Sequence, residues 1–337
     1  MRRGRIAGLV LVSIFAAAGL VLSQPSPARA YNPYYDDYTR LSCRPLSMGQ
    51  AFTAISDDAS AVFWNPAGLA TQHKLSLMHN HSARHMPRHI AKGEVDQLDG
   101  DTQAVVFPIA PCLTAAAGFN FQGEMGYDYR RVEPESGLPD ERFAAVERFE
   151  GLGLSFSPWT QVGAARRSFH HRFENSGESG WSRVGDGYSW GIRQWVAPGV
   201  TYGYAESRAD FDSDDKSSGR IKRSDSGWAV RPAGWLLLAW DKGSQANVWR
   251  EEGDRFDPLP ADKTVETNRF GAEINLAGIA RLRCGLLAGQ KTFGFEWTLP
   301  NLRLWYTEAE NYLDRVIGAS LSEMRDVHLY GFVLTLP

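Results

Sequence analysis

Apolar and polar residues alternate along most of the chain beyond residue 75, and this alternation predicts β-strands. In 271–276 every second residue is apolar, and Glu273 lies between two of them. After a corner at 277–278 the alternation resumes, now with Arg281 and Arg283 in the polar row. Because successive side chains of a strand point to opposite faces, the stretch predicts a hairpin with one apolar face and one charged face.

The same pattern predicts about fourteen strands along the chain. They cover 75–84, 102–110, 114–123, 142–156, 161–170, 182–196, 199–208, 225–239, 245–251, 266–276, 279–288, 291–299, 301–308 and 326–336. Many are close to the roughly 10 residues of an outer-membrane barrel strand. Short corners at 157–159, 197–199 and 300–301 alternate with longer polar loops such as the acid-rich 210–219. Such alternation of loop lengths is typical of an up-and-down meander.

Two all-β architectures would use these strands. A soluble barrel or sandwich would bury the apolar faces, whereas a membrane barrel would turn them to lipid and keep polar side chains in its lumen. Charged residues in mid-strand, such as Glu273 and Arg281, favour a wet lumen. Aromatic residues near strand ends suit interfacial girdles; they include Trp159, Trp181, Trp195, Trp240, Trp249, Trp297, Trp305 and Tyr306. We therefore expect an all-β, transmembrane up-and-down β-barrel of about 14 antiparallel strands, with the soluble barrel as the alternative.

The first 30 residues have the layout of a secretory signal peptide. Three arginines precede an uncharged apolar run of 17 residues, 6–22, and residues 28–30 read Ala-Arg-Ala, the form of a cleavage site. A membrane anchor is the alternative, but the run is shorter than the ~20 residues of a spanning helix. We expect export, cleavage near Ala30 and a mature chain that begins at Tyr31.

The charge balance argues against a nucleic-acid partner. The net charge is −3, and loss of the four arginines of the signal peptide would leave 32 basic against 39 acidic residues, a net of −7. Nucleic-acid binding proteins usually carry a basic surplus. Three cysteines are too few, and odd in number, for a disulfide framework. The sequence contains no Cys/His metal motif, and we expect no cofactor.

The block 43–70 carries the most specific motif of the chain. Its matching residues are Arg44, Met48, Gly49, Ala51, Phe52, Ala54, Asp57, Asp58, Ala59, Ser60, Ala61, Asn65, Pro66, Ala67, Gly68 and Leu69. This pattern resembles the start of the outer-membrane transport family typified by the FadL long-chain fatty acid transporters, and still more that of their PorV/PorQ-like relatives. The late segments 271–285 and 292–303 resemble the same family's late strands.

The resemblance implies that residues 31–72 fold as a hatch, or plug, inside a barrel formed by 73–337. The residues it points to in the hatch are Phe52, Asp57, Asp58, Phe63, Trp64, Asn65 and Pro66. Asp57 and Asp58 would pair with lumen arginines such as Arg281 or Arg283, and Glu273 would complete the polar lumen. The chain departs from the pattern at Pro337, since such barrels end on an aromatic residue, and its shorter length implies reduced extracellular loops.

Three short motifs hold residue types that support other chemistry. His79 and His81 have a chelating spacing, but no carboxylate or thiol lies nearby in the sequence. Residues 210–214 resemble the start of a calcium loop, yet Asp215 stands where glycine is expected and no Glu occupies the twelfth place. Residues 187–191 have the GxSxG spacing inside a predicted strand, whereas a nucleophile elbow needs a strand-to-helix turn. We expect neither a metal site nor catalytic residues, with a barrel hydrolase as the enzymatic alternative.

The predicted function follows from the resemblance. It implies passive uptake of hydrophobic, fatty-acid-like or aromatic small molecules across the bacterial outer membrane, with the membrane lipids and the ligand as partners. PorV/PorQ-like relatives are accessory or scaffold components of secretion machinery. A scaffold barrel that binds secretion-system proteins is therefore the first alternative, and a structural barrel without a substrate is the second.

Overall fold

The computed structural model describes eight stretches of the chain. They are residues 42–85, 100–127, 141–175, 178–214, 218–250, 264–287, 290–310 and 326–336. All of them belong to one compact unit, Tyr31–Pro337. The predicted signal peptide with its cleavage site, and residues 31–41 of the predicted hatch, lie outside the described residues.

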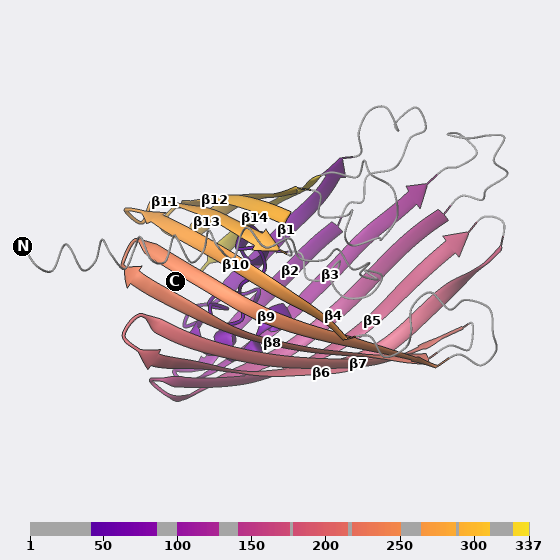
Figure 1. Cartoon of the computed structure of the whole chain (residues 1–337), viewed down its shortest axis with the longest axis horizontal. Coiled ribbons are helices and arrows are strands. Elements are labelled where there is room, and N and C mark those ends of the chain that lie inside the picture. The colour runs from indigo at the N-terminus through magenta and orange to yellow at the C-terminus, as the bar shows by residue number, and fades with distance from the viewer. Residues whose placement is uncertain are drawn as a thin grey trace, which may run out of the picture. The chain divides into compact units, whose positions relative to one another are not determined.

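Fourteen antiparallel strands form a closed barrel in which each strand pairs with its neighbours in the sequence and β1 pairs with β14 (Figure 1). The strands are β1 (Ser76–His85), β2 (Gly100–Ala110), β3 (Leu113–Tyr127), β4 (Glu141–Ser157), β5 (Thr160–Asn175), β6 (Glu178–Ala197), β7 (Val200–Ser213), β8 (Ser218–Ala233), β9 (Leu236–Arg250), β10 (Thr264–Leu276), β11 (Ala280–Leu287), β12 (Gln290–Thr298), β13 (Leu302–Glu310) and β14 (Asp326–Thr335). Closure leaves no edge strand with unpaired backbone groups. The predicted all-β barrel and its strand number are confirmed, and the hatch stays a prediction.

The largest errors in the predicted boundaries lie between β7 and β9. The predicted strand 225–239 runs through the turn between β8 and β9, where Ala233 pairs with Leu236. The Pro-Ala-Gly sequence of 232–234 is a turn signal, but the apolar residues on both sides of it extended the alternation across the turn. The acid-rich 210–219 is also less of a loop than predicted, because both of its ends continue the paired strands β7 and β8.

The apolar residues of the barrel wall face outward. In the hairpin of β10 and β11, the exposed fractions of Ile274, Leu276 and Leu282 are 37%, 45% and 44%, whereas Glu273 and Arg283 are buried. This arrangement is the reverse of a soluble barrel, which would bury its apolar face. It agrees with the predicted orientation of the hairpin.

Outward aromatic rings form contacts from strand to strand. The ring centroids of Trp190 and Tyr204 are 5.3 Å apart, and those of Tyr202 and Trp228 are 4.9 Å apart. Outward residues farther from the short turns include charged pairs such as Arg166–Asp186 at 3.1 Å and Lys242–Glu266 at 3.0 Å. The outer surface therefore carries apolar and aromatic side chains along the strands, with charged pairs farther from the short turns.

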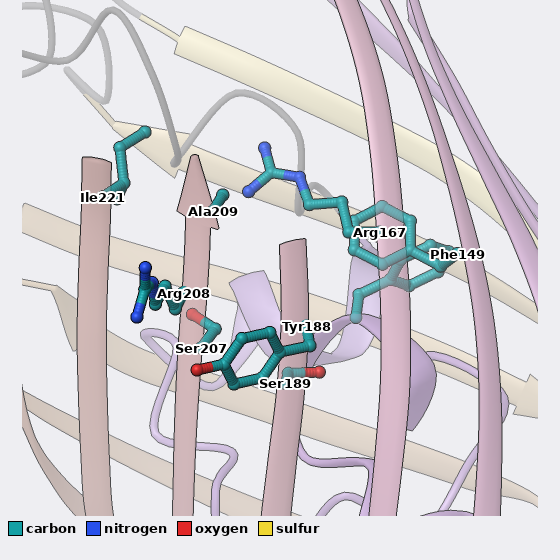
Figure 2. Close-up of a pocket in the computed structure, with 9 residues that line it drawn as sticks. Phe149, Arg167, Tyr188, Ser189, Ser207, Arg208, Ala209 and Ile221 are labelled. Carbon is teal, nitrogen blue, oxygen red and sulfur yellow. The ribbon is translucent and has the colours of Figure 1, made fainter. Parts of the chain in front are cut away.

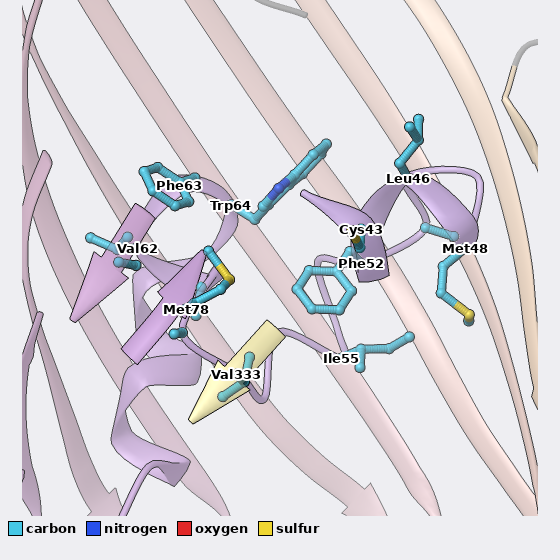
Figure 3. Packing of buried hydrophobic residues seen from close by; sticks show 14 of the residues in the cluster. Cys43, Leu46, Met48, Phe52, Ile55, Val62, Phe63, Trp64, Met78 and Val333 are labelled. Atoms are coloured by element: carbon cyan, nitrogen blue, oxygen red, sulfur yellow. The ribbon is translucent and has the colours of Figure 1, made fainter. Parts of the chain in front are cut away.

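The N-terminal segment, residues 42–72, contains the helices α2 (Cys43–Ser47) and α3 (Ala61–Trp64) and the 3-10 helix η1 (Pro66–Thr71). Nearly all of its residues are buried, and they form one apolar cluster with inward-facing wall residues such as Met78 and Val333 (Figure 3). Among the residues that the structure describes, no helix has the length and apolar character needed to cross a membrane.

Candidate functional site

Glycines of the barrel wall make room for the N-terminal segment. A Cβ atom at Gly118 would lie 2.6 Å from the ring of Phe63, and one at Gly163 would collide with the backbone of Pro66. Glycine within a strand often marks a place where another backbone approaches closely. The segment and the wall are therefore packed against each other at backbone distance, which accounts for glycine at these wall positions.

Asn65 and Pro66 form the corner between α3 and η1. The side-chain amide of Asn65 donates to the carbonyl oxygens of Thr53 at 2.8 Å and Ile192 at 3.3 Å. Its oxygen accepts from the backbone N–H of Ala67 at 3.1 Å, as an N-cap does, and Pro66 occupies the first helical position, where its missing N–H is not needed. One side chain thus starts a helix, closes the segment on itself and joins it to β6.

An ionic cluster joins the segment to β10. The guanidinium of Arg44 bonds to Asp57, to Asp58 at 3.2 Å and to Glu273 at 3.2 Å. Its side chain is only 3% exposed, so the guanidinium is held away from bulk water. We predicted that Asp57 and Asp58 would pair with Arg281 or Arg283. The structure places Arg44 in that role instead, because the arginine of the same motif lies closer to both carboxylates.

The wall supplies the other half of this cluster. Arg283 bonds to Glu273 at 2.7 Å and also to Glu296, and Arg281 bonds to Glu296 at 3.1 Å. Glu273 therefore bridges the segment and the barrel. The structure brings together the predicted polar residues Glu273, Arg281 and Arg283, and it adds Arg44 and Glu296. Glu296 occupies the polar row of β12, and this alternation was the only sequence signal for its inward orientation.

The charge state of Asp57 depends on this cluster. Burial raises the pKa of its carboxyl, but the guanidinium groups of Arg44, Arg193 and Arg231 lower it more, so the pKa lies well below its usual range. Asp57 is consequently ionised at neutral pH, and the ion pair with Arg44 is complete.

Asp241 provides a second connection between the segment and the wall. Its carboxylate accepts hydrogen bonds from the backbone N–H groups of Phe52 at 2.8 Å and Thr53 at 2.7 Å. The carboxylate is fully buried on β9. Sequence reasoning missed Asp241, because the alternation around it is the same as in the other strands and no recognisable motif lies next to it.

A small pocket of mixed apolar and polar lining lies between Phe63 of the segment and the wall, and Figure 2 shows its wall residues. The ring of Phe63 meets that of Phe149 edge-on at 4.9 Å, and the guanidinium of Arg167 lies over the rings of Phe149 and Phe169 at 5.7 and 4.8 Å. The free space is about 10 Å³, close to what one water molecule needs. The remaining lining residues are Tyr188, Ser189, Ser207, Arg208, Ala209 and Ile221.

Trp64 is the second large aromatic residue of the segment. It is 5% exposed, and the guanidinium of Arg223 lies 5.4 Å from its ring centroid. Of the predicted aromatic pair, Trp64 thus packs on an inward arginine of β8, whereas Phe63 packs on the ring of Phe149. A cation over the face of an aromatic ring is attracted by the partial negative charge of that face.

Two of the other motifs lie on paired strands of the wall. Ser189 lies within β6 and pairs with Ala165, so the GxSxG stretch forms no nucleophile elbow. His79 and His81 point outward beside Asp101, whose carboxylate is 3.8 and 3.0 Å from them. Even so, no group of three or more His, Cys, Asp or Glu within the described ranges is arranged to hold a metal ion.

Comparisons with known proteins connect this architecture to solved barrels. No protein-family model and no curated protein matches the sequence. The chain is similar in structure to the P. putida toluene transporter TodX, with a TM-score of 0.63 at 12% identity over 89% of this chain and 99% of that one. It is similar to the Ralstonia pickettii toluene transporter TbuX, with a TM-score of 0.62 at 11% identity over 92% and 100%. It is also similar to a Pseudomonas aeruginosa FadL homologue, with a TM-score of 0.59 at 11% identity over 87% and 97%.

At these identities the likeness establishes the fold. The chain has the fourteen-stranded barrel fold of FadL-type proteins, as the sequence resemblance implied. None of these three structures is a PorV/PorQ-like barrel, so that half of the resemblance stays a prediction.

Proposed function

We propose that this protein is a bacterial outer-membrane barrel through which hydrophobic small molecules enter by passive diffusion, with residues 42–72 as the hatch. The observation that carries the proposal is a lumen that holds a buried segment, which packs on apolar residues of the wall and is also joined to it by buried polar groups. Arg44 and Asp241 make two of these polar connections, and both are buried. A segment held in this way can leave as a unit when the ionic cluster opens.

The outer surface supports the membrane placement. Outward apolar and aromatic side chains on the strands, with charged pairs farther from the short turns, suit a wall that contacts lipid along part of its height. The three similar structures are a FadL homologue and two toluene transporters by name. Their names make uptake of apolar molecules, rather than enzymatic turnover, the function to test first.

Ligand binding is the first test. The mature chain is folded in detergent and titrated with toluene and with a long-chain fatty acid while tryptophan fluorescence is followed. We expect saturable quenching, because Trp64 is the next residue after Phe63, which lines the pocket. The Trp64→Phe variant should lose most of the signal, whereas Trp297→Phe, which removes an outward ring that is 51% exposed, should keep it. Absence of saturable binding for both ligands would refute the proposal.

Uptake tests the gating role of the hatch. Cells that carry the Asn65→Ala variant should insert the barrel normally but accumulate labelled ligand at a changed rate, since Asn65 joins the segment to β6. An unchanged rate with normal insertion would show that the hatch does not control passage.

A further inference from the structure

Two polar side chains face the lumen of the barrel without a role in the ionic cluster. Asn80 on β1 is 1% exposed and Trp305 on β13 is 5% exposed. Across the described residues, neither the side-chain amide of Asn80 nor the indole N–H of Trp305 has a hydrogen-bond partner. Buried polar groups are almost always satisfied, so such exceptions need an explanation.

The two groups converge on one point of the wall. Asn80 and Trp305 both pair with Gly331 of β14, one from each side. A Cβ atom at Gly331 would lie 2.6 Å from Nε1 of Trp305 and closer still to Oδ1 of Asn80. Because residue 331 has no side chain, the amide oxygen and the indole N–H lie within reach of a single small polar group.

Nearby polar side chains do not satisfy the pair. The hydroxyl of Thr102, which pairs with Asn80, donates to Asn120 at 3.3 Å. Thr307, the next inward residue of β13 after Trp305, donates to the carbonyl of Cys43 at 2.8 Å. That second bond also shows that the pair lies beside α2, at the edge of the hatch.

The surroundings of the pair are apolar. Met78 on β1 and Leu329 and Val333 on β14 are the inward neighbours, two residues away along the strands, and all three are fully buried. The guanidinium of Arg303 lies over the ring of Trp305 at 5.7 Å. The unpaired indole N–H of Trp305 and the unpaired amide oxygen of Asn80 thus lie among mostly apolar side chains.

We propose that Asn80 and Trp305 form a subsite for the hydroxyl group of a hydrophobic ligand such as a phenol or an alcohol. The proposal rests on the uptake function proposed above and specifies its substrate class. A hydroxyl accepts from the indole N–H and donates to the amide oxygen, so it pairs both of these atoms at once. A hydrocarbon would leave both of them unpaired.

The test compares p-cresol with toluene, which differ by one hydroxyl group. Binding of each labelled compound is measured by equilibrium dialysis of the detergent-folded protein against a detergent blank. We expect p-cresol to bind more tightly, and Trp305→Phe and Asn80→Leu to weaken its binding about fivefold each, as loss of one net hydrogen bond would. Toluene binding should change less than twofold. Trp297→Phe, an outward substitution of the same kind on β12, should leave both ligands unaffected.

Both variants remove an unsatisfied buried group and keep most of the side-chain volume, so we expect them to fold. If p-cresol and toluene bind equally and neither variant changes their ratio, the two groups hold only water and the subsite is refuted while uptake stands. If neither compound binds to the wild-type protein, the proposed function itself fails.

Discussion

Replacement of Arg44 by methionine tests how the hatch is held. Arg44→Met keeps a long side chain but removes the charge shared by Asp57, Asp58 and Glu273. Breaking a buried ion pair from one side typically costs about 3–5 kcal/mol. The lower end applies, because Glu273 keeps its bond to Arg283 and Asp57 is 25% exposed. About 3 kcal/mol corresponds to a rise on the order of 100-fold in the fraction of open hatch.

Cys43 provides the assay. It lies in α2, is 0% exposed, and burial raises the pKa of its thiol, so it should react with a maleimide only when the hatch leaves the lumen. The exposed Cys112 and Cys284 are first replaced by serine. Labelling of Cys43 in the Arg44→Met barrel should then be on the order of 100-fold faster than in the parent.

Arg281→Met is the matched control. Arg281 is 25% exposed and bonds to Glu296 of the wall, so its loss should change the labelling rate less than about threefold, as is usual for partly exposed pairs. If Arg44→Met folds into a barrel and labels no faster than the parent, Arg44 does not hold the hatch and the reasoning is refuted.

Three further predictions use the same thiol. The low pKa of Asp57 means that its ion pair stabilises the closed hatch above the ordinary aspartate pKa of about 4, and that this stabilisation is lost as the pH falls below that value. Labelling of Cys43 with dithiodipyridine, which reacts in acid, should therefore become faster at low pH. The same change of pH should accelerate labelling much less in Arg44→Met. Asn65→Ala removes a helix cap and two bonds to the backbone, so labelling should rise about tenfold, as expected for a loss of about 1–2 kcal/mol; an unchanged rate would mean that other contacts hold the corner. Gly163→Val places a side chain against the backbone of Pro66 and should expose Cys43 strongly, whereas Gly234→Val, at a turn where a Cβ meets no atom within 4 Å, should not; equal rates in the two variants would argue against close packing of the hatch on the wall.

The sequence alone was enough for the class of fold and the direction of its faces. Alternation is a local property that every strand carries by itself, so the hairpin of β10 and β11 could be oriented from its own residues. The motif around Asn65 and Pro66 likewise marked the corner that the structure has. Local patterns failed where two apolar runs flank a turn, as at Gly234.

Only the tertiary structure decided which side chains meet. Arg44 and Glu273 are 229 residues apart, and Asp241 is 189 residues from Phe52, so no local pattern connects them. Their contact depends on closure of the barrel, which sets the register of every strand and the side of the wall that each part of the N-terminal segment touches. The meeting of Asn80 and Trp305 over Gly331 has the same origin, because it requires β1, β14 and β13 to be neighbours, and that neighbourhood exists only once the last strand has paired with the first.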